Sequence, residues 1–332
     1  MTSRTLALRI GTTVAAMAVA SFVLPQIVGS IGVLDFICVA AIFAIAAIGY
    51  DLLIGSTGMF ALGQAGLMCL GAYAAGYTAV TLKGSPFEAA CLAVALPVAA
   101  TLVIGGPSLR LRGVYFGVAT LVFAILVTAI ATAWTSVTGG ATGLAGIPPL
   151  GGGNVLKVNY AFWLPLSVCS LAVFLAAAWA LNGSRVGDAW RTIARDELLA
   201  ANLGIDVFRY KMLAFLLSAA FAGYAGFLFA YYLQFLAPDA FGLRLSISLL
   251  LMVFLGGAGT VWGPIIGAFV VHGLFTFIPS KNDWFEVFFA LVVLAVLALL
   301  PRGLAGLFGR RGAARAGSGG RRAALAAKPE TN

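Results

Sequence analysis

Ser184-Arg-Val-Gly-Asp-Ala-Trp-Arg-Thr-Ile-Ala-Arg-Asp-Glu-Leu-Leu-Ala-Ala-Asn-Leu-Gly-Ile-Asp-Val-Phe-Arg-Tyr-Lys211 is a long charged stretch between two membrane-length apolar runs. Within it, Asp196 is a favourable helix N-cap, and Gly204 is a favourable helix stop. The residues between them, 197–203, are expected to form a seven-residue helix. Glu197 would then lie at the positive end of the helix dipole, where a carboxylate is stabilising.

This short helix carries an apolar ridge, because Leu199 and Leu203 are four residues apart. Isolated helices of this length are marginal in water. Two interpretations follow from the residues alone. The helix is a handle held by another protein, or it lies flat on the membrane interface.

The composition identifies an integral membrane protein. Of the 332 residues, 62% are apolar and 9% are charged, whereas soluble domains carry about 25% charged residues. The 41 glycines are also typical of membrane helices that pack closely or are interrupted.

The apolar runs predict an all-α, polytopic bundle with about ten transmembrane helices, since about 20 residues are needed for each crossing. The expected segments are 10–28, 32–54, 58–80, 89–106, 114–134, 160–181, 212–234, 245–258, 261–278 and 284–300. Residues 245–278 would form a helix of about 51 Å, too long for one crossing. We therefore expect breaks at Gly256–Gly259 and, by analogy, at Gly55–Gly58.

Basic residues orient this bundle. Lys and Arg are counted together, with the N-terminus placed in the cytoplasm. Two of them precede the first span, two lie at positions 110 and 112, five lie in 184–211 and seven lie beyond 301. The cytoplasmic face then holds 16 of the 20. This agrees with the positive-inside rule. It also accounts for the net charge of +9 without nucleic acid as a partner. Both termini are therefore expected in the cytoplasm.

Two segments outside the helices have distinctive compositions. Residues 135–159, rich in glycine and proline, predict a non-cytoplasmic loop without regular helix that docks a partner or acts as a lid. Residues 302–332 are basic and are expected to form a disordered cytoplasmic tail on anionic membrane lipid. The transmembrane domain would then cover residues 1–301. Its first segment resembles a signal peptide, but its length favours a retained helix.

The residue inventory disfavours an enzyme. No phosphate-binding loop motif occurs, and one histidine with few carboxylates provides neither a catalytic constellation nor a metal site. Cys38, Cys69, Cys91 and Cys169 are interpreted as small buried side chains. Asp51 is expected to reach water or to cap a helix. His272 is either a pathway residue or a neutral imidazole bonded to a neighbouring helix.

Residues 55–73 are the candidate translocation segment. Glycines at 55, 58, 63, 66 and 71 admit close approach and free backbone groups, and broken helices at mid-membrane are a feature of transporters. The alternative is plain helix packing through small residues. Residues expected to line a path are Gly58, Gln64, Gly66, Tyr73, Tyr115 and Gly256.

Five stretches together resemble the M-type permease subunit of branched-chain amino acid ABC importers, over roughly residues 35–300. They are Gly55–Tyr73, Leu109–Leu121, Thr138–Pro149, Gly187–Lys211 and Leu249–Gly267. Permeases for urea and short amides are close relatives of this family. The chain departs from the family pattern at Asp51, Gln64 and Leu199, and the first two of these departures leave the cargo open.

The resemblance implies half of a translocation path in the bacterial inner membrane. The implied partners are a second homologous permease, two cytoplasmic ATPase subunits that bind ATP, and a periplasmic binding protein. This chain itself would bind no cofactor. The implied coupling helix is gripped by an ATPase, through Arg195, Asp196, Glu197, Ala200, Leu203 and Gly204. The rival interpretations are a urea or short-amide permease and a stand-alone ion-coupled carrier.

Overall fold

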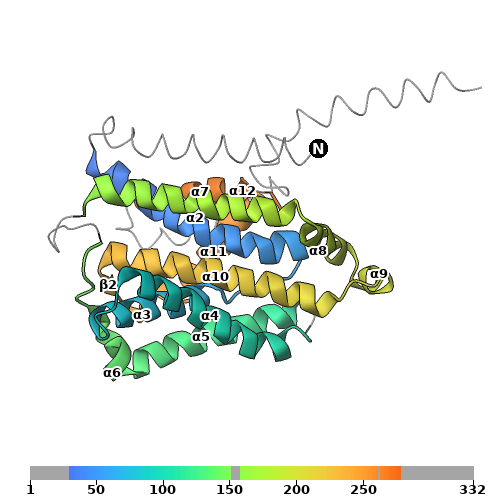
Figure 1. Ribbon diagram of the computed structural model, residues 1–332, viewed down its shortest axis with the longest axis horizontal. Helices are drawn as coiled ribbons and strands as arrows, with labels where there is room; N and C mark the ends of the chain where they lie inside the picture. Colours follow the sequence, from blue (N-terminus) through green and yellow to red (C-terminus); the bar gives the residue numbers. More distant parts are fainter. Residues whose placement is uncertain (1–29, 112, 151–157, 261, 278–332) are drawn as a thin grey trace, which may run out of the picture.

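The computed structural model describes residues 30–111, 113–150, 158–260 and 262–277, and these form a bundle of membrane-length helices (Figure 1). The expected spans 10–28 and 284–300 and the tail 302–332 lie outside the described residues. Within the described residues, eight helices follow the long apolar runs of the sequence.

All eight predicted segments within the described residues are confirmed as helices. They are α2 (Ile31–Thr57), α3 (Gln64–Val80), α4 (Pro86–Ser108), α5 (Val114–Ala133), α7 (Tyr160–Asn182), α10 (Val207–Leu233), α11 (Leu243–Gly256) and α12 (Gly263–Phe277). Six stretches in the described part are long and apolar enough to cross a membrane: α2, α4, α5, α7, α10 and the stretch Pro238–Gly256 that includes α11. The expected total of ten crossings is therefore not confirmed.

Two further helices lie at one end of the bundle, at the right of Figure 1: α8 (Arg185–Arg195) and α9 (Glu197–Asn202). The opposite end carries α6 (Thr135–Thr138), the 3-10 helices η1 (Gly140–Thr142) and η2 (Pro238–Phe241), and the strands β1 (Leu144–Ala145) and β2 (Phe235–Leu236). We call these the α8–α9 end and the β1–β2 end.

The expectation of an all-α chain with an irregular loop at 135–159 was wrong in detail. That loop contains one helical turn, α6, and the strand β1, which pairs antiparallel with β2 so that Leu144 faces Leu236. Gly143, at φ 80°, lies directly against the Leu236 carbonyl, where a side chain would collide. The loop is thereby fixed to the residues that follow α10.

Helix α10 lies at the centre of the bundle, and its main contacts are with α2, α3 and α4 (Figure 1). Close packing of α10 on α3 depends on glycine. A Cβ atom at Gly226 would overlap the Met68 carbonyl oxygen, and one at Gly71 would overlap Gly223. Small residues that bring helix backbones together are typical of membrane helix interfaces.

Both predicted breaks are confirmed. Helix α2 ends at Thr57, and Gly58 follows in the left-handed conformation at φ 73°, donating its N–H to the Ile54 carbonyl. Helix α11 ends at Gly256, and α12 begins only at Gly263. The segment expected to begin at 58 was placed too early, because α3 starts at Gln64 and residues 58–63 are not helical.

The interpretation of the cysteines was partly wrong. Cys38 and Cys69 are buried, Cys169 is half-buried and Cys91 is exposed on α4. Apolar surroundings in the sequence of a membrane protein do not distinguish a core position from an outward-facing one, because the lipid-facing surface is as apolar as the core.

Substitution of Gly226 tests the α3–α10 crossing. Gly226→Val places three carbon atoms against the α3 backbone and is expected to destabilise the protein by about 1–3 kcal/mol, the usual effect of overpacking. Thermal unfolding in detergent measures this. Gly106→Val is the matched control, since a Cβ atom there meets nothing within 4 Å. Equal midpoints for both variants would contradict the close crossing.

Candidate functional site at the α8–α9 end

Helix α8 is a feature that the sequence-based prediction missed. Its N-cap is Ser184, whose Oγ accepts the Val186 N–H at 3.2 Å. The signal was present, because Val186, Trp190 and Ile193 are spaced at i, i+4 and i+7, the pattern of an amphipathic helix. Trp190 is fully buried, and its indole N–H donates to the Tyr210 carbonyl at 2.8 Å. Helix α8 is thus fixed to the start of α10.

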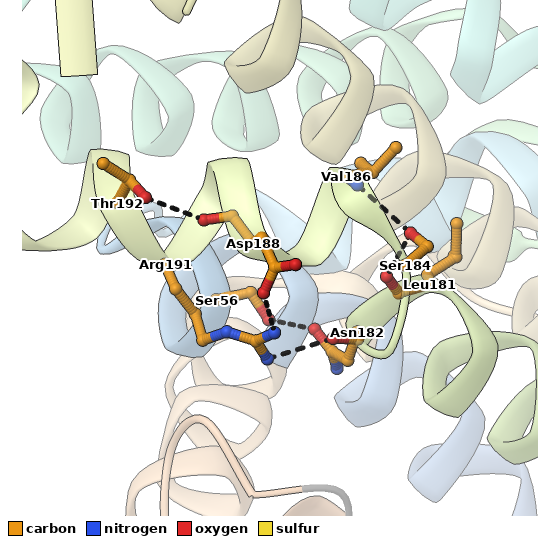
Figure 2. Close-up of polar contacts among 8 residues, drawn as sticks. All are labelled: Ser56, Leu181, Asn182, Ser184, Val186, Asp188, Arg191 and Thr192. Carbon is orange, nitrogen blue, oxygen red and sulfur yellow. Dashed lines mark hydrogen bonds and ion pairs between the residues drawn. The ribbon is translucent and has the colours of Figure 1, made fainter. Parts of the chain in front are cut away.

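A polar junction joins α8 to the ends of α2 and α7 (Figure 2). Ser56 of α2 donates its hydroxyl to Asn182 Oδ1 at 3.0 Å. Arg191 of α8 donates to the Asn182 carbonyl at 3.0 Å and pairs with Asp188 at 2.6 Å. Asn182, the last residue of α7, therefore holds three helices together through its two oxygens.

Helix α9 has the predicted ends. Asp196 accepts the N–H groups of Leu198 at 2.8 Å and Leu199 at 3.1 Å, which is the expected N-cap. The helix covers Glu197–Asn202, one residue shorter than expected. Gly204 follows at φ 80°, a conformation that glycine adopts without strain.

One face of α9, which we call the α9 face, is apolar and exposed. It consists of Leu198, 69% exposed, the half-exposed Leu199, and Leu203, the C-cap residue of α9, which is 67% exposed. Leu198 was not singled out from the sequence. Ala200 is buried and packs the helix onto the bundle instead of facing outward. Arg195 is exposed at the end of α8, beside this face.

Glu197 is held by an ion pair. Its Oε1 lies 2.5 Å from Nζ of Lys211 on α10, and the Lys211 side chain is only 9% exposed. A buried ammonium needs a partner of opposite charge, because an unpaired buried charge costs several kcal/mol. Glu197 therefore attaches α9 to α10, and its own side chain stays 45% exposed.

Residues 59–63 of the non-helical segment are buried or half-buried in the bundle, and neighbouring side chains satisfy two of its backbone groups. The Leu62 N–H donates to Thr120 Oγ1 on α5 at 2.9 Å, and the Tyr50 hydroxyl on α2 donates to the Ala61 carbonyl. Membrane proteins tolerate such irregular backbone only where protein groups or water satisfy it. This segment is a broken helix of the kind expected from the glycine pattern.

Gln64, the first residue of α3, joins three helices. Its Nε2 donates to the Ser218 carbonyl of α10 at 3.3 Å and to the Ala46 carbonyl of α2 at 3.5 Å. The Ser218 hydroxyl donates to Gln64 Oε1 at 3.1 Å. Gln64 is thus buried and paired where the broken segment becomes helical.

The other candidate path residues are dispersed. Gly58 lies against Ala194 of α8, and Gly66 lies against Ala124 of α5. Gly256 crosses Gly263 at the second break. Tyr115 is 75% exposed on the first turn of α5, far from the interior. The structure does not bring the six residues together in one cavity.

Tyr73 lines an apolar groove of about 300 Å³ among α3, α4 and α5. Its hydroxyl donates to the Leu236 carbonyl at 3.4 Å, beside the paired strands. Val127 and Trp134 of α5 form the opposite wall, and Leu96 of α4 closes one side. The groove presents carbon atoms almost exclusively and suits an apolar occupant.

One expectation was that Asp51 reaches water, and this was wrong. It is buried on α2, and its Oδ1 accepts the Gly259 N–H at 2.7 Å, within the break between α11 and α12. His272 of α12 stacks on Phe36 of α2, with ring centroids 5.5 Å apart, and its Nε2 lies 3.4 Å from the Thr276 hydroxyl of its own helix. Among the described residues, His272 contacts the neighbouring helix α2 through this stacking and not through the expected hydrogen bond.

Comparisons with known proteins agree with the resemblance. Residues 32–297 match the family described as branched-chain amino acid transport system / permease component. The high-affinity branched-chain amino acid transport system permease protein LivM of Escherichia coli (strain K12) is 28% identical over 303 residues, covering 82% of this chain and 70% of LivM. LivH of the same strain is 26% identical over 288 residues, covering 80% of this chain and 91% of LivH.

A third relative is named for the import of a different solute. The autoinducer 2 import system permease protein LsrC of Klebsiella pneumoniae is 33% identical over 144 residues, covering 41% of this chain and 42% of LsrC. No solved structure matches the chain.

Asp51→Ala tests the bond between α2 and the second break. The substitution leaves the Gly259 N–H without its acceptor, and we expect a loss of about 1–3 kcal/mol in the free energy of unfolding. Asp51→Asn keeps a carbonyl oxygen and is expected to remain within about 1 kcal/mol of the wild type. Chemical denaturation in detergent measures both. Equal losses would show that charge, not the accepted hydrogen bond, matters at this position.

Proposed function

Because the chain belongs to the permease family of branched-chain amino acid transport systems, we propose that it lines half of the path of an ATP-driven importer. The cargo proposed is a branched-chain or related amino acid. Relatives named LivM and LivH occur as two permeases of one transport system, which supports pairing with a second homologous permease.

The observation that carries this proposal is the α9 face. Three exposed leucines stand on a short helix with capped ends, at one end of a membrane bundle whose sequence has no phosphate-binding loop. A helix this short is not stable alone and gains from a protein groove that covers its leucines. We assign that groove to a cytoplasmic ATPase subunit, which supplies the ATP site.

The six coupling residues then have separate roles. Leu203 contacts the ATPase together with Leu198 and Leu199, and Arg195 offers a positive charge beside them. Asp196 and Gly204 fix the ends of the helix. Ala200 packs inward, and Glu197 anchors the helix to Lys211.

The proposed location is the bacterial inner membrane, with the α8–α9 end and both termini in the cytoplasm. Lys and Arg at the α8–α9 end outnumber those at the β1–β2 end by six to two among the described residues, which supports this orientation. The six are Arg110, Arg185, Arg191, Arg195, Arg209 and Lys211. The β1–β2 end, with its glycine-rich loop, would then face a periplasmic binding protein.

The proposed path uses the broken segment. Gly58, Gln64 and Gly66 lie on or beside residues 58–63, and Tyr73 lies further along α3. We also propose Gly256 and Tyr115 as path residues. Gly256 lies at the break between α11 and α12, and Tyr115 lies on an exposed surface available to the partner permease. ATP-driven movement at the α8–α9 end would alternate the accessibility of these residues.

The relatives do not favour a urea or short-amide cargo, since LivM and LivH, which match over 303 and 288 residues, are named as branched-chain amino acid permeases. A stand-alone ion-coupled carrier is the remaining rival. Proteoliposomes that contain the purified chain alone distinguish it. We expect no uptake of leucine under an imposed ion gradient, and uptake by the chain alone would overturn the proposal.

Removing the leucines tests the α9 face. Leu198→Ser with Leu203→Ser is expected to weaken ATPase binding at least tenfold, because about 1.5–3 kcal/mol of burial is lost for each leucine. The measurement is co-purification of the ATPase with tagged permease from membranes. Leu82→Ser is the control, since Leu82 is similarly exposed at the β1–β2 end. Unchanged co-purification of the double variant would remove α9 as the docking helix.

Cysteine labelling tests the orientation. In a background with the four native cysteines replaced, Leu203→Cys is expected to react with a membrane-impermeant maleimide only after spheroplasts are permeabilised. Leu82→Cys is expected to react in intact spheroplasts, because Leu82 follows α3, whose C-terminal part packs against Leu144 and Leu236 at the β1–β2 end. The reverse pattern would place the α8–α9 end outside the cell.

A further inference from the structure

We propose that α10 transmits movement of α9 to the broken segment, with Lys211 and Ser218 as positioning residues. This inference rests on the proposed function, since it assumes that an ATPase moves α9. Neither residue stood out in the sequence as part of a site. The structure connects each of them to a residue that did: Lys211 to Glu197, and Ser218 to Gln64.

The first connection is the ion pair between the buried Lys211 and Glu197, whose side chain is 45% exposed. Lys211 Nζ and Glu197 Oε1 are 2.5 Å apart, and the lysine side chain is almost fully covered. Separating the pair would leave an ammonium in a dry environment, so the pair strongly resists opening. When α9 moves, Lys211 must follow it or lose its partner. The start of α10 is therefore attached to the docking helix α9, and the Trp190 bond to the Tyr210 carbonyl attaches it to the neighbouring helix α8.

The second connection lies further along the same helix face. Ser218 and Gln64 exchange hydrogen bonds in both directions, at 3.1 and 3.3 Å, and Ser218 is fully buried. Gln64 follows directly after the non-helical residues 58–63. A shift of Ser218 therefore acts on the point where the broken segment joins α3.

The distance between the two connections suits a rigid link. Lys211 and Ser218 are seven residues apart, about two helical turns and about 10.5 Å along the axis, so both face the same side. Helix α10 is an uninterrupted helix of 27 residues without proline. Axial movement at Lys211 is thus carried to Ser218 with little bending.

The experiment uses the complete transporter in proteoliposomes, with both permeases, the ATPases and the binding protein. The measured quantity is leucine taken up per ATP hydrolysed. Lys211→Met removes the charge but keeps the chain length, and it is expected to lower this ratio at least tenfold while the ATPase still co-purifies. Ser218→Ala is expected to lower the ratio about fivefold. The double variant should be no worse than Lys211→Met, because both act on one route.

Two substitutions control for charge and for buried hydroxyls. Arg209→Met removes an exposed cation that pairs with Asp206 in the first turn of α10, and it should retain the wild-type ratio. Ser170→Ala removes a hydroxyl bonded to Tyr224 between α7 and α10, and it should also retain that ratio. A wild-type ratio for Lys211→Met, or strictly additive losses in the double variant, would overturn the proposal.

A charge exchange decides the case in which Lys211→Met does not accumulate in membranes. Lys211→Glu combined with Glu197→Lys restores the pair with reversed polarity, and uptake should recover at least fivefold over Glu197→Lys alone. No recovery, with both proteins present in equal amounts, would overturn the proposal. Failure of the proposed function appears differently, because the wild-type assembly itself would then show no ATP-dependent uptake.

Discussion

The absence of water in a bilayer constrains this fold more than any other factor, because each backbone N–H and C=O at membrane depth needs a partner within the protein. Unbroken helices meet this requirement by themselves. The two interruptions in the described chain need help from side chains. Thr120 and Tyr50 serve residues 58–63, and Asp51 serves the break at Gly259. Three buried polar side chains thus provide partners for the irregular segments.

The same constraint makes the chemistry of the α8–α9 end differ from that of the membrane region. At the α8–α9 end, Arg191, Arg209 and Lys211 form ion pairs and helix ends are capped, so exposed leucines differ from their polar surroundings. In the membrane region exposed leucines are ordinary, since lipid covers them. The significance of Leu198 and Leu203 comes from their position beyond the bundle, not from their exposure as such.

Much of the fold could be predicted from the sequence, because apolar length and helix-ending residues act locally. Eight helices, the breaks at Gly58 and Gly256, and the caps of α9 follow from neighbouring residues. Long-range pairs could not be predicted in this way. Asp51 and Gly259 are 208 positions apart, and a carboxylate near a helix end is equally consistent with solvent contact. The start of α3 was missed because glycines at 58 and 63 are compatible with either helix or extended chain.

Among the site residues, Ala200 and Glu197 were associated with α9 correctly. The directions of their side chains, inward for Ala200 and toward Lys211 for Glu197, depend on α10.

The pairing of β1 with β2 has a consequence for both faces of the membrane. Strand β2 follows α10 after one residue, so its pairing with β1 attaches the glycine-rich loop to one end of α10, a helix about 40 Å long. Helix α9 is attached to the other end of α10 through Glu197 and Lys211. Thermodynamic linkage is reciprocal. If nucleotide occupancy inside the cell alters how firmly a ligand-loaded receptor is held outside, receptor occupancy must alter nucleotide affinity by the same factor.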